Sequence, residues 1–388
     1  MSASGHPFAS LVGFAASSSI CLSSLIMAGC AQDLPDPRLI INHRVLAIQT
    51  GVTASPFPDQ APDPERPKAQ ALPFETVTIT PYIVNEAGIV DPDTLDIVWL
   101  ACELTPGLGL FACISAATPV ALADIPECTA PSFDALMGDE LPELVSPCVI
   151  GREGTPEYVA PLSANVFVSG AIELTMIAGV PGGTSTDTCA AELLRGEYDL
   201  PDDCLYAVQR LNIGPVELLL SIAASFGLEI PGFEIPDPED IPEPDHNPRI
   251  SQVRVGIIND EGEQVGNAQI VPFGGVVSAP REVRLQVEVD SPKEDLQTYS
   301  IPVNNGESYE ERSEAYQGDW YRTWGRLLSG TSDDPMSYNQ WVLTQDEQDE
   351  TEAPADGRAR MYYVVRDGRQ GVNWFWFEVE VTEPEPVP

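Results

Sequence analysis

Cysteine is the residue type whose number and spacing in this chain most directly indicate chemistry. Eight cysteines occur among 388 residues, and two of them, Cys21 and Cys30, lie in an apolar N-terminal stretch. The other six are Cys102, Cys113, Cys128, Cys148, Cys189 and Cys204. An even number of cysteines in an exported chain predicts disulfide bonds, with pairings that the sequence leaves open. Proximity along the chain favours Cys102–Cys113, Cys128–Cys148 and Cys189–Cys204.

A metal site is the alternative use of six thiols. No CxxC pair occurs, and the histidines after the apolar stretch are only His43 and His246. A zinc site needs four closely placed sulfur or nitrogen ligands. We therefore expect no zinc and no cofactor. Calcium is possible at the acidic stretches 237–245 and 346–352, although neither matches an EF-hand loop.

Residues 1–29 are typical of an export leader that ends before Cys30. Residues 1–30 contain no Asp, Glu, Lys or Arg, and the small-residue run Met27–Gly29 directly precedes the cysteine. The arrangement resembles a bacterial lipobox, which implies cleavage before Cys30 and lipidation of that residue. An uncleaved membrane helix is the alternative, but the apolar run is shorter than the roughly 20 residues that a span needs. We predict a lipid-anchored protein of the cell envelope, with Ala31 favouring the outer membrane.

Acidic residues outnumber basic ones by 60 to 19, which gives a formal net charge of −41. Such a charge repels the phosphate backbone of nucleic acids and anionic lipid headgroups. The sequence therefore predicts no nucleic-acid partner, and contact with the membrane through the lipid anchor.

Motifs typical of hydrolytic catalysis are missing from the sequence. No GxSxG, HExxH or P-loop pattern occurs, and residues 107–112 match a dinucleotide fingerprint without the helix that should follow it. We expect a protein that is not an enzyme. The alternative is a carboxylate-based envelope hydrolase or a carbohydrate-binding accessory protein, because 60 acidic residues contain many possible carboxylate pairs.

Apolar and polar residues alternate along much of the chain. The segments Thr94–Ala101, Asn165–Met176 and Glu282–Asp290 have the period of two that predicts half-buried antiparallel strands. Residues 215–227 begin with proline and end with glycine, which predicts a helix. The fold class is therefore all-β, with two tandem Ig-like β-sandwich domains, the first carrying a cysteine-rich, partly helical insertion.

Proline-rich segments mark the expected boundaries. We predict a lipoprotein signal peptide at 1–29, a lipid-anchored tether at 30–43, a disulfide-containing Ig-like domain with insertions at 44–230, a proline-rich acidic linker at 231–248 and a C-terminal Ig-like domain at 249–384. Trp320 or Trp324 is expected at the centre of the second domain.

The segment 358–381 predicts a β-hairpin with its turn at 367–371. Pairing Val364 with Trp374 directs the two phenylalanines of the second strand toward the core. A shift of one residue would bury two glutamates instead, at a large desolvation cost.

That register places Tyr362, Trp374 and Trp376 on the face of the hairpin that also carries charge. Bare apolar surface costs about 25 cal/mol per Å² in water, so something should cover the rings. One interpretation is packing within the chain, with Arg360 or a loop over the rings. The other is a candidate binding surface that stacks on a sugar ring or on a side chain of a partner.

Four motifs resemble those of exported lipoproteins of myxobacteria and related deltaproteobacteria, and they are Arg44–Gln49, Trp99–Cys102, Trp320–Gly325 and Val364–Trp374. The resemblance implies Ig-like β-domains on an envelope anchor and no established activity. We accordingly expect a non-catalytic surface or periplasmic scaffold or adhesion module that binds an envelope protein or a polysaccharide.

Overall fold

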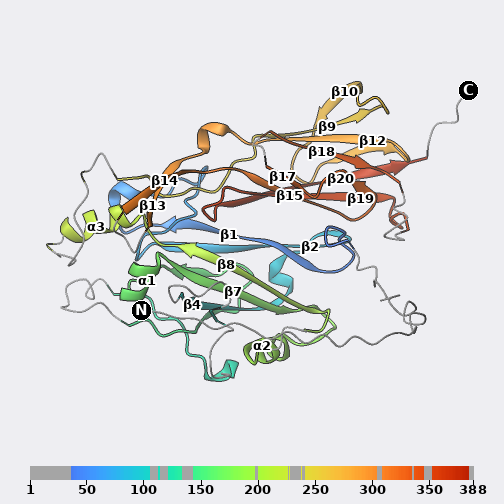
Figure 1. Ribbon diagram of the computed structural model, residues 1–388. Helices are drawn as coiled ribbons and strands as arrows, with labels where there is room; N and C mark the ends of the chain where they lie inside the picture. Colours follow the sequence, from blue (N-terminus) through green and yellow to red (C-terminus); the bar gives the residue numbers. More distant parts are fainter. Residues whose placement is uncertain are drawn as a thin grey trace, which may run out of the picture. The chain divides into compact units, whose positions relative to one another are not determined.

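The computed structural model describes residues 36–104, 112–113, 121–132, 143–196, 200–225, 227, 237, 241–303, 308–333, 336–344 and 352–383. Residues 37–388 belong to one compact unit and residues 1–36 to another. The expected leader and Cys30 lie outside the described residues, as do residues 107–111 and 346–351. Within the described part the protein is mostly β, with several antiparallel sheets (Figure 1).

Two four-stranded sheets form the first half of the larger unit. One contains β1 (Arg44–Ala54), β2 (Thr76–Asn85) and β3 (Gly88–Ile89), with β6 (Glu157–Val159) also paired to β2. The other has the order β5 (Cys148–Gly151), β4 (Asp96–Glu103), β7 (Ala171–Gly179) and β8 (Cys204–Asn212). A core that includes Ile79, Trp99 and Leu174 lies between them. The residues that the period of two predicts on β4 are buried, but Val98 and Leu100 between them are buried as well, so β4 is buried on both faces rather than half-buried.

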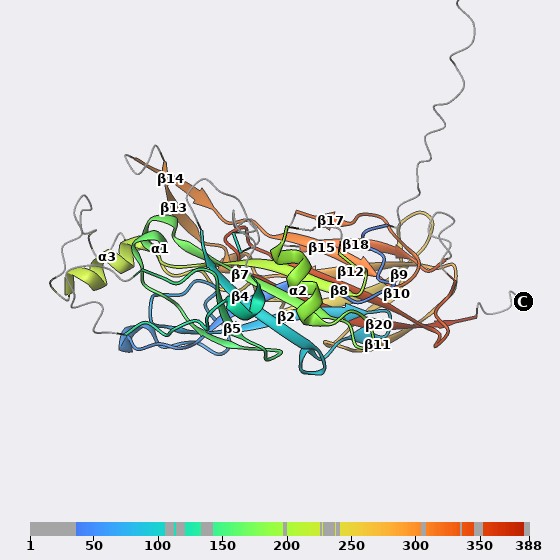
Figure 2. The same ribbon diagram turned by 90° about the horizontal axis from the view of Figure 1, so that it is seen from below.

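The other face of β4 and β7 packs against α2 (Thr186–Leu194), which Figure 2 shows beside these strands. This second core includes Val98, Leu100 and Ile177 together with cysteines. The structure contains the three disulfides that sequence proximity favours, Cys102–Cys113, Cys128–Cys148 and Cys189–Cys204. Two of these bonds therefore tie loops and α2 to a sheet face that would otherwise be open.

Two five-stranded sheets form the second half. The first has the order β10 (Gln264–Ile270), β9 (Gln252–Ile258), β12 (Arg284–Asp290), β18 (Met336–Val342) and β16 (Arg326–Leu327). The second has the order β11 (Val276–Pro280), β20 (Val372–Thr382), β19 (Arg358–Arg366), β15 (Gln317–Arg322) and β17 (Thr331–Ser332), and β11 runs parallel to β20. β13 (Thr298–Val303) and β14 (Ser308–Ser313) pair separately.

Aromatic side chains fill the core between these two sheets. Trp320, Trp341 and Phe377 are each at most 1% exposed. The indole nitrogen of Trp320 donates to the hydroxyl of Ser332 at 3.0 Å, so the buried N–H is satisfied. Trp324 is also buried, but it follows β15 rather than lying on it.

Helices are short, and one of them replaces part of an expected strand. The segment predicted as a strand over Asn165–Met176 begins as α1 (Ala164–Ser169), and β7 starts only at Ala171. Ser163 caps the helix by accepting the N–H of Val166, and Gly170 ends it at a φ of 65°. The predicted helix over 215–227 is confirmed as α3 (Val216–Ser225). Short 3-10 turns lie at Pro58–Gln60, Pro92–Thr94, Leu122–Asp124 and Lys293–Asp295.

The hairpin formed by β19 and β20 has the predicted register. Val364 lies opposite Trp374, Tyr363 opposite Phe375 and Met361 opposite Phe377. The two phenylalanines are 8% and 1% exposed and join the core of the second half. The outer face of the same hairpin carries the candidate binding residues.

Candidate functional site

The outer face of β19 and β20 packs against the outer face of β1 and β2. Tyr362 and Val364 lie in one buried apolar cluster with Leu46, Tyr82 and Val84. The sequence suggested Arg360 or a loop as a cover within the chain, whereas in the structure the apolar face of β1 and β2 lies over this side of the hairpin. Each face covers the other, so the aromatic rings are protected within the chain.

Hydrogen bonds close the same junction. The side-chain amide of Asn247, at the end of the expected linker, donates to the carbonyl of Thr50 on β1 at 2.7 Å and accepts the N–H of Val372 on β20 at 2.9 Å. Arg366 reaches from β19 to the carbonyl of Leu46 at 2.9 Å. Asn247 itself is 3% exposed. The C-terminal end of the linker is thus packed between strands from both halves.

The three candidate residues occupy different depths of this junction. Tyr362 is fully buried, and its hydroxyl donates to the carbonyl of Asn85 at 2.8 Å. Trp374 is half-buried and stacks on Tyr82, with ring centroids 4.8 Å apart. Trp376 is also half-buried and stacks on Tyr362 at 6.3 Å. Burial raises the pKa of Tyr362 far above its usual value, so its hydroxyl remains a donor.

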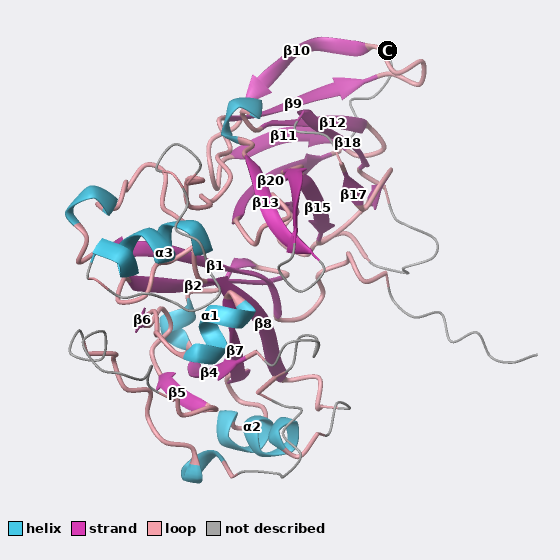
Figure 3. Ribbon diagram, turned by 60° about the vertical axis from the view of Figure 1, so that its left-hand side comes forward, coloured by secondary structure: helices cyan, strands magenta, loops and turns pink. Residues whose placement is uncertain are grey.

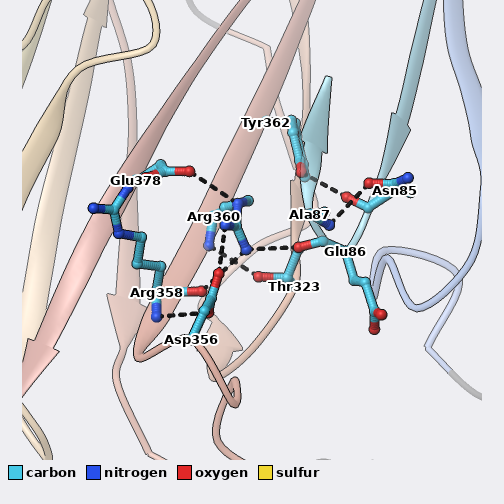
Figure 4. A network of polar contacts seen from close by, with 9 residues as sticks. All are labelled: Asn85, Glu86, Ala87, Thr323, Asp356, Arg358, Arg360, Tyr362 and Glu378. Atoms are coloured by element: carbon cyan, nitrogen blue, oxygen red, sulfur yellow. Dashed lines mark hydrogen bonds and ion pairs between the residues drawn. The ribbon is translucent and has the colours of Figure 1, made fainter. Parts of the chain in front are cut away.

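A network of charged residues borders Tyr362 (Figure 4). Arg360 is 6% exposed, and its guanidinium contacts Glu378 at 3.0 Å, Asp356 at 2.6 Å and the carbonyl of Glu86 at 2.7 Å. Burial alone would lower the pKa of Arg360, but the hydrogen bonds and charges of Asp356 and Glu378 raise it overall. Arg358 contacts the second oxygen of Glu378 at 2.6 Å. These side chains hold the hairpin against the turn between β2 and β3.

A second polar cluster lies at the hairpin turn. Arg369 contacts Glu314 at 2.9 Å, and Asp367 accepts the backbone N–H groups of Arg369 and Gly371 at 2.8 and 3.1 Å. Asp245 is 1% exposed, and neither of its carboxylate oxygens has a hydrogen-bond partner among the described residues. Burial, reinforced by the charge of Asp367, raises the pKa of Asp245 to about 8. Burial likewise raises the pKa of Asp367 to about 7.

These two carboxyl groups interact, so they titrate as a pair that holds a proton near neutral pH. Asp367 is 2% exposed, so both groups are closed off from solvent. Such a pair has the pKa of a general acid or base, but a substrate would need access that this burial denies. The pair of carboxyl groups therefore affects the stability of the folded protein.

A groove of about 510 Å³ opens beside Trp374. Its lining comes from three separate segments, Ile250–Val253, Ile270–Phe273 and Asn373–Phe375. Phe273 is 55% exposed, and its ring meets those of Phe375 and Trp376 edge-on at 5.8 and 6.5 Å. Of the three candidate residues, Trp374 is therefore the one that lines a surface groove.

Apolar side chains gather around the same groove. Ile270, which lines the groove, is 67% exposed, and Val276, three residues after Phe273 in the sequence, is 50% exposed. Contiguous exposed apolar surface on a soluble protein marks sites of interaction. These residues were not predicted from the sequence. The run Ile270–Phe273, directly before Gly274 and Gly275, is apolar without the alternation of a strand, and this departure could have identified them.

A smaller groove of about 440 Å³ lies beside the charged network and is lined by Ile40, Ile41, Thr323, Pro354 and Arg360, among others. Of its charged lining residues, Arg360 and Asp356 pair with each other. Within the described part of the chain, no group of three or more His, Cys, Asp or Glu side chains is placed to hold a metal ion. No helix among the described residues is long and apolar enough to span a membrane.

Comparison with known proteins yields little. No family model and no curated protein matches the chain. Among solved structures, the dimeric latent form of PorU from Porphyromonas gingivalis is similar at 11% identity and a TM-score of 0.19. The alignment covers 89% of this chain and 24% of that protein, so this chain spans about a quarter of its length. A similarity at this TM-score supports no inference about fold or function.

Proposed function

We propose that this protein is a non-catalytic lipoprotein of the cell envelope that acts as a scaffold or adhesion-type binding module. The observation that carries the proposal is that two exposed apolar side chains, Ile270 and Phe273, line the groove beside Trp374. An apolar surface of this kind gains free energy when a partner covers it. Elsewhere the high net charge keeps the protein soluble and disfavours unspecific association.

The architecture that we infer is a pair of tandem Ig-like β-sandwich domains, at 44–230 and 249–384. Each sheet pair surrounds its own apolar core, which supports two domains. The aromatic junction between β2 and β20, closed by Asn247, supports a fixed arrangement of these domains. A fixed arrangement suits a scaffold, because it holds the groove of the second domain in a constant position relative to the first domain.

Export and anchoring are part of the same proposal. Three disulfides favour an oxidising compartment outside the cytoplasm. Lipidation at Cys30 would then tether the chain to the envelope, with the outer membrane as its location. Replacing Cys30 with serine should move the protein from the membrane fraction to the soluble fraction. The matched Cys21→Ser variant should stay in the membrane fraction, and an unchanged distribution for Cys30→Ser would refute the anchor.

Binding at the groove is tested with envelope fractions. Immobilised wild-type protein should retain a component of the protein or polysaccharide fraction that Phe273→Ser does not retain. Leu328→Ser is the matched control, because Leu328 is 68% exposed and does not line the groove. Equal retention by all three proteins would reject the groove as the binding surface.

A further inference from the structure

We propose that β10 accepts an extended, basic segment of a partner protein as an additional strand, with an apolar side chain of that segment seated in the groove beside Trp374. This inference rests on the proposed binding function and names the chemistry of the partner.

The free edge of β10 is the first support. β10 is the terminal strand of its sheet and, among the described strands, pairs only with β9, as Figure 3 shows. Val271 donates its N–H to Val253 at 2.9 Å, toward the β9 side. Because successive residues of a strand direct their N–H groups to opposite sides, the N–H and C=O of Ile270 face the open edge. Such an edge is a template for one more strand.

β10 also lacks the charges that commonly protect an edge strand. Its residues, Gln264–Ile270, include no charged side chain and no proline, and six of the seven are exposed. Charged residues make up 20% of the whole chain. The pairing with β9 is irregular between Val265 and Gln269, and Gly266 has a φ of 79°. Regular pairing with β9 resumes at Gln269 and Ile270, and Ile270 lines the groove.

The groove gives the added strand an anchor. Ile270 ends β10 and lines the groove, so a side chain of a strand that pairs beside Ile270 lies next to it. Phe273 and Trp374 offer aromatic surface there, while Ile270 extends the apolar area. A branched or aromatic side chain on the incoming strand therefore has a contact surface in reach. Backbone hydrogen bonds supply affinity in this mode, and the pocket supplies specificity.

Charge identifies the partner as basic. Asp260, Glu261 and Glu263 are exposed at the turn between β9 and β10, at the end of β10 farther from the groove. At about 3.4 Å per residue, the seven residues of β10 separate this acidic turn from the groove by roughly 24 Å. A segment with Lys or Arg at one end and an apolar residue about seven positions away matches both the acidic turn and the apolar groove. A second copy of this chain is disfavoured, because each copy carries a net charge of −41.

The test uses a displayed library of random peptides of about nine residues, long enough to run beside the seven residues of β10 and within the usual range of strand lengths. Selection on the intact mature protein should enrich peptides that combine an apolar residue with Lys or Arg. Phe273→Ser should weaken the best peptide by at least about tenfold, whereas Leu328→Ser should leave its affinity unchanged. N-methylation of alternate peptide nitrogens should weaken binding by a similar factor for one alternating set and not for the other. Rising salt concentration should weaken binding as well.

The possible outcomes distinguish a failure of strand addition from a failure of the proposed binding function. If Phe273→Ser abolishes binding but neither N-methylated set does, strand addition is wrong and the groove remains a binding surface. If no selected peptide is sensitive to Phe273→Ser while a polysaccharide fraction is, the occupant is a glycan and the peptide partner is refuted. If nothing that binds is sensitive to Phe273→Ser, the proposed function fails together with the inference. Unchanged melting temperatures of both variants exclude unfolding as the cause.

Discussion

Replacing Asp245 with asparagine should stabilise the folded protein at pH 8 and change how its stability depends on pH. Asp245 is 1% exposed, and burial together with the charge of Asp367 raises its pKa to about 8. Ionisation above that pH places a second negative charge beside Asp367 in a site closed to water. Asparagine has nearly the same shape and stays neutral at every pH.

The sign and size of this effect on stability follow from the difference in the pKa of Asp245 between the folded and unfolded states. An aspartate in the unfolded chain loses its proton near pH 3.9, whereas Asp245 in the folded protein keeps it up to about pH 8. Between these values the folded state binds more protons, so the free energy of unfolding falls as pH rises. At about 1.4 kcal/mol for each unit of pKa, the contribution of Asp245 over this interval is a loss of up to roughly 5 kcal/mol.

The assay is urea unfolding of wild type and Asp245→Asn at a series of pH values from about 5 to 8. Near pH 5, about one unit above the pKa of an unfolded aspartate, the variant should be the more stable by only about 1–2 kcal/mol. Toward pH 8 the variant should become the more stable by several kcal/mol. Asp260→Asn removes an exposed carboxylate and should follow the wild-type curve. If the curves of unfolding free energy against pH run parallel for wild type and Asp245→Asn, the inference that Asp245 is buried and protonated is wrong.

Three further variants test other parts of the structure. Arg360→Met should cost about 1.5–3 kcal/mol in chemical unfolding, because it removes the buried partner of Glu378 while Arg358 still contacts that carboxylate; a cost below about 1 kcal/mol would contradict the pairing. Replacing Cys189 and Cys204 together with alanine should cost about 3 kcal/mol, since their bond closes a loop with a sequence separation of 15; no change in the midpoint would mean that the bond does not form. Trp320→Phe removes the hydrogen bond to the hydroxyl of Ser332 and should cost about 1–3 kcal/mol, with equal stability as the contrary result.

Local sequence patterns were sufficient to predict the register of the hairpin and the pairing of the disulfides. The register of β19 and β20 follows from strand alternation, because only one register keeps both Phe377 in the core and Glu378 off the core side. The cysteine pairs lie close in sequence, so short loops bring them together. Alternation also predicted which side of β12 is buried, and Leu285 and Val287 are at most 1% exposed.

Long-range packing explains what the sequence did not predict. The aromatic face of the hairpin is covered by Leu46 and Tyr82, more than 270 residues earlier in the chain, and no local pattern encodes that contact. The groove joins three segments that are separate in sequence, so its lining residues share no motif. The strand expected from Asn165 was shortened because a serine cap and Gly170 stabilise a helical turn there.

Hydrogen–deuterium exchange is the most direct test of the binding surface. The mature protein would be labelled alone and with the best peptide from the displayed library. Slower exchange of backbone amides from Gly266 to Phe273, with unchanged exchange beside Arg360, is the expected result. Protection around Arg360, or no change along β10, would contradict the assignment of the groove and its edge strand as the binding site.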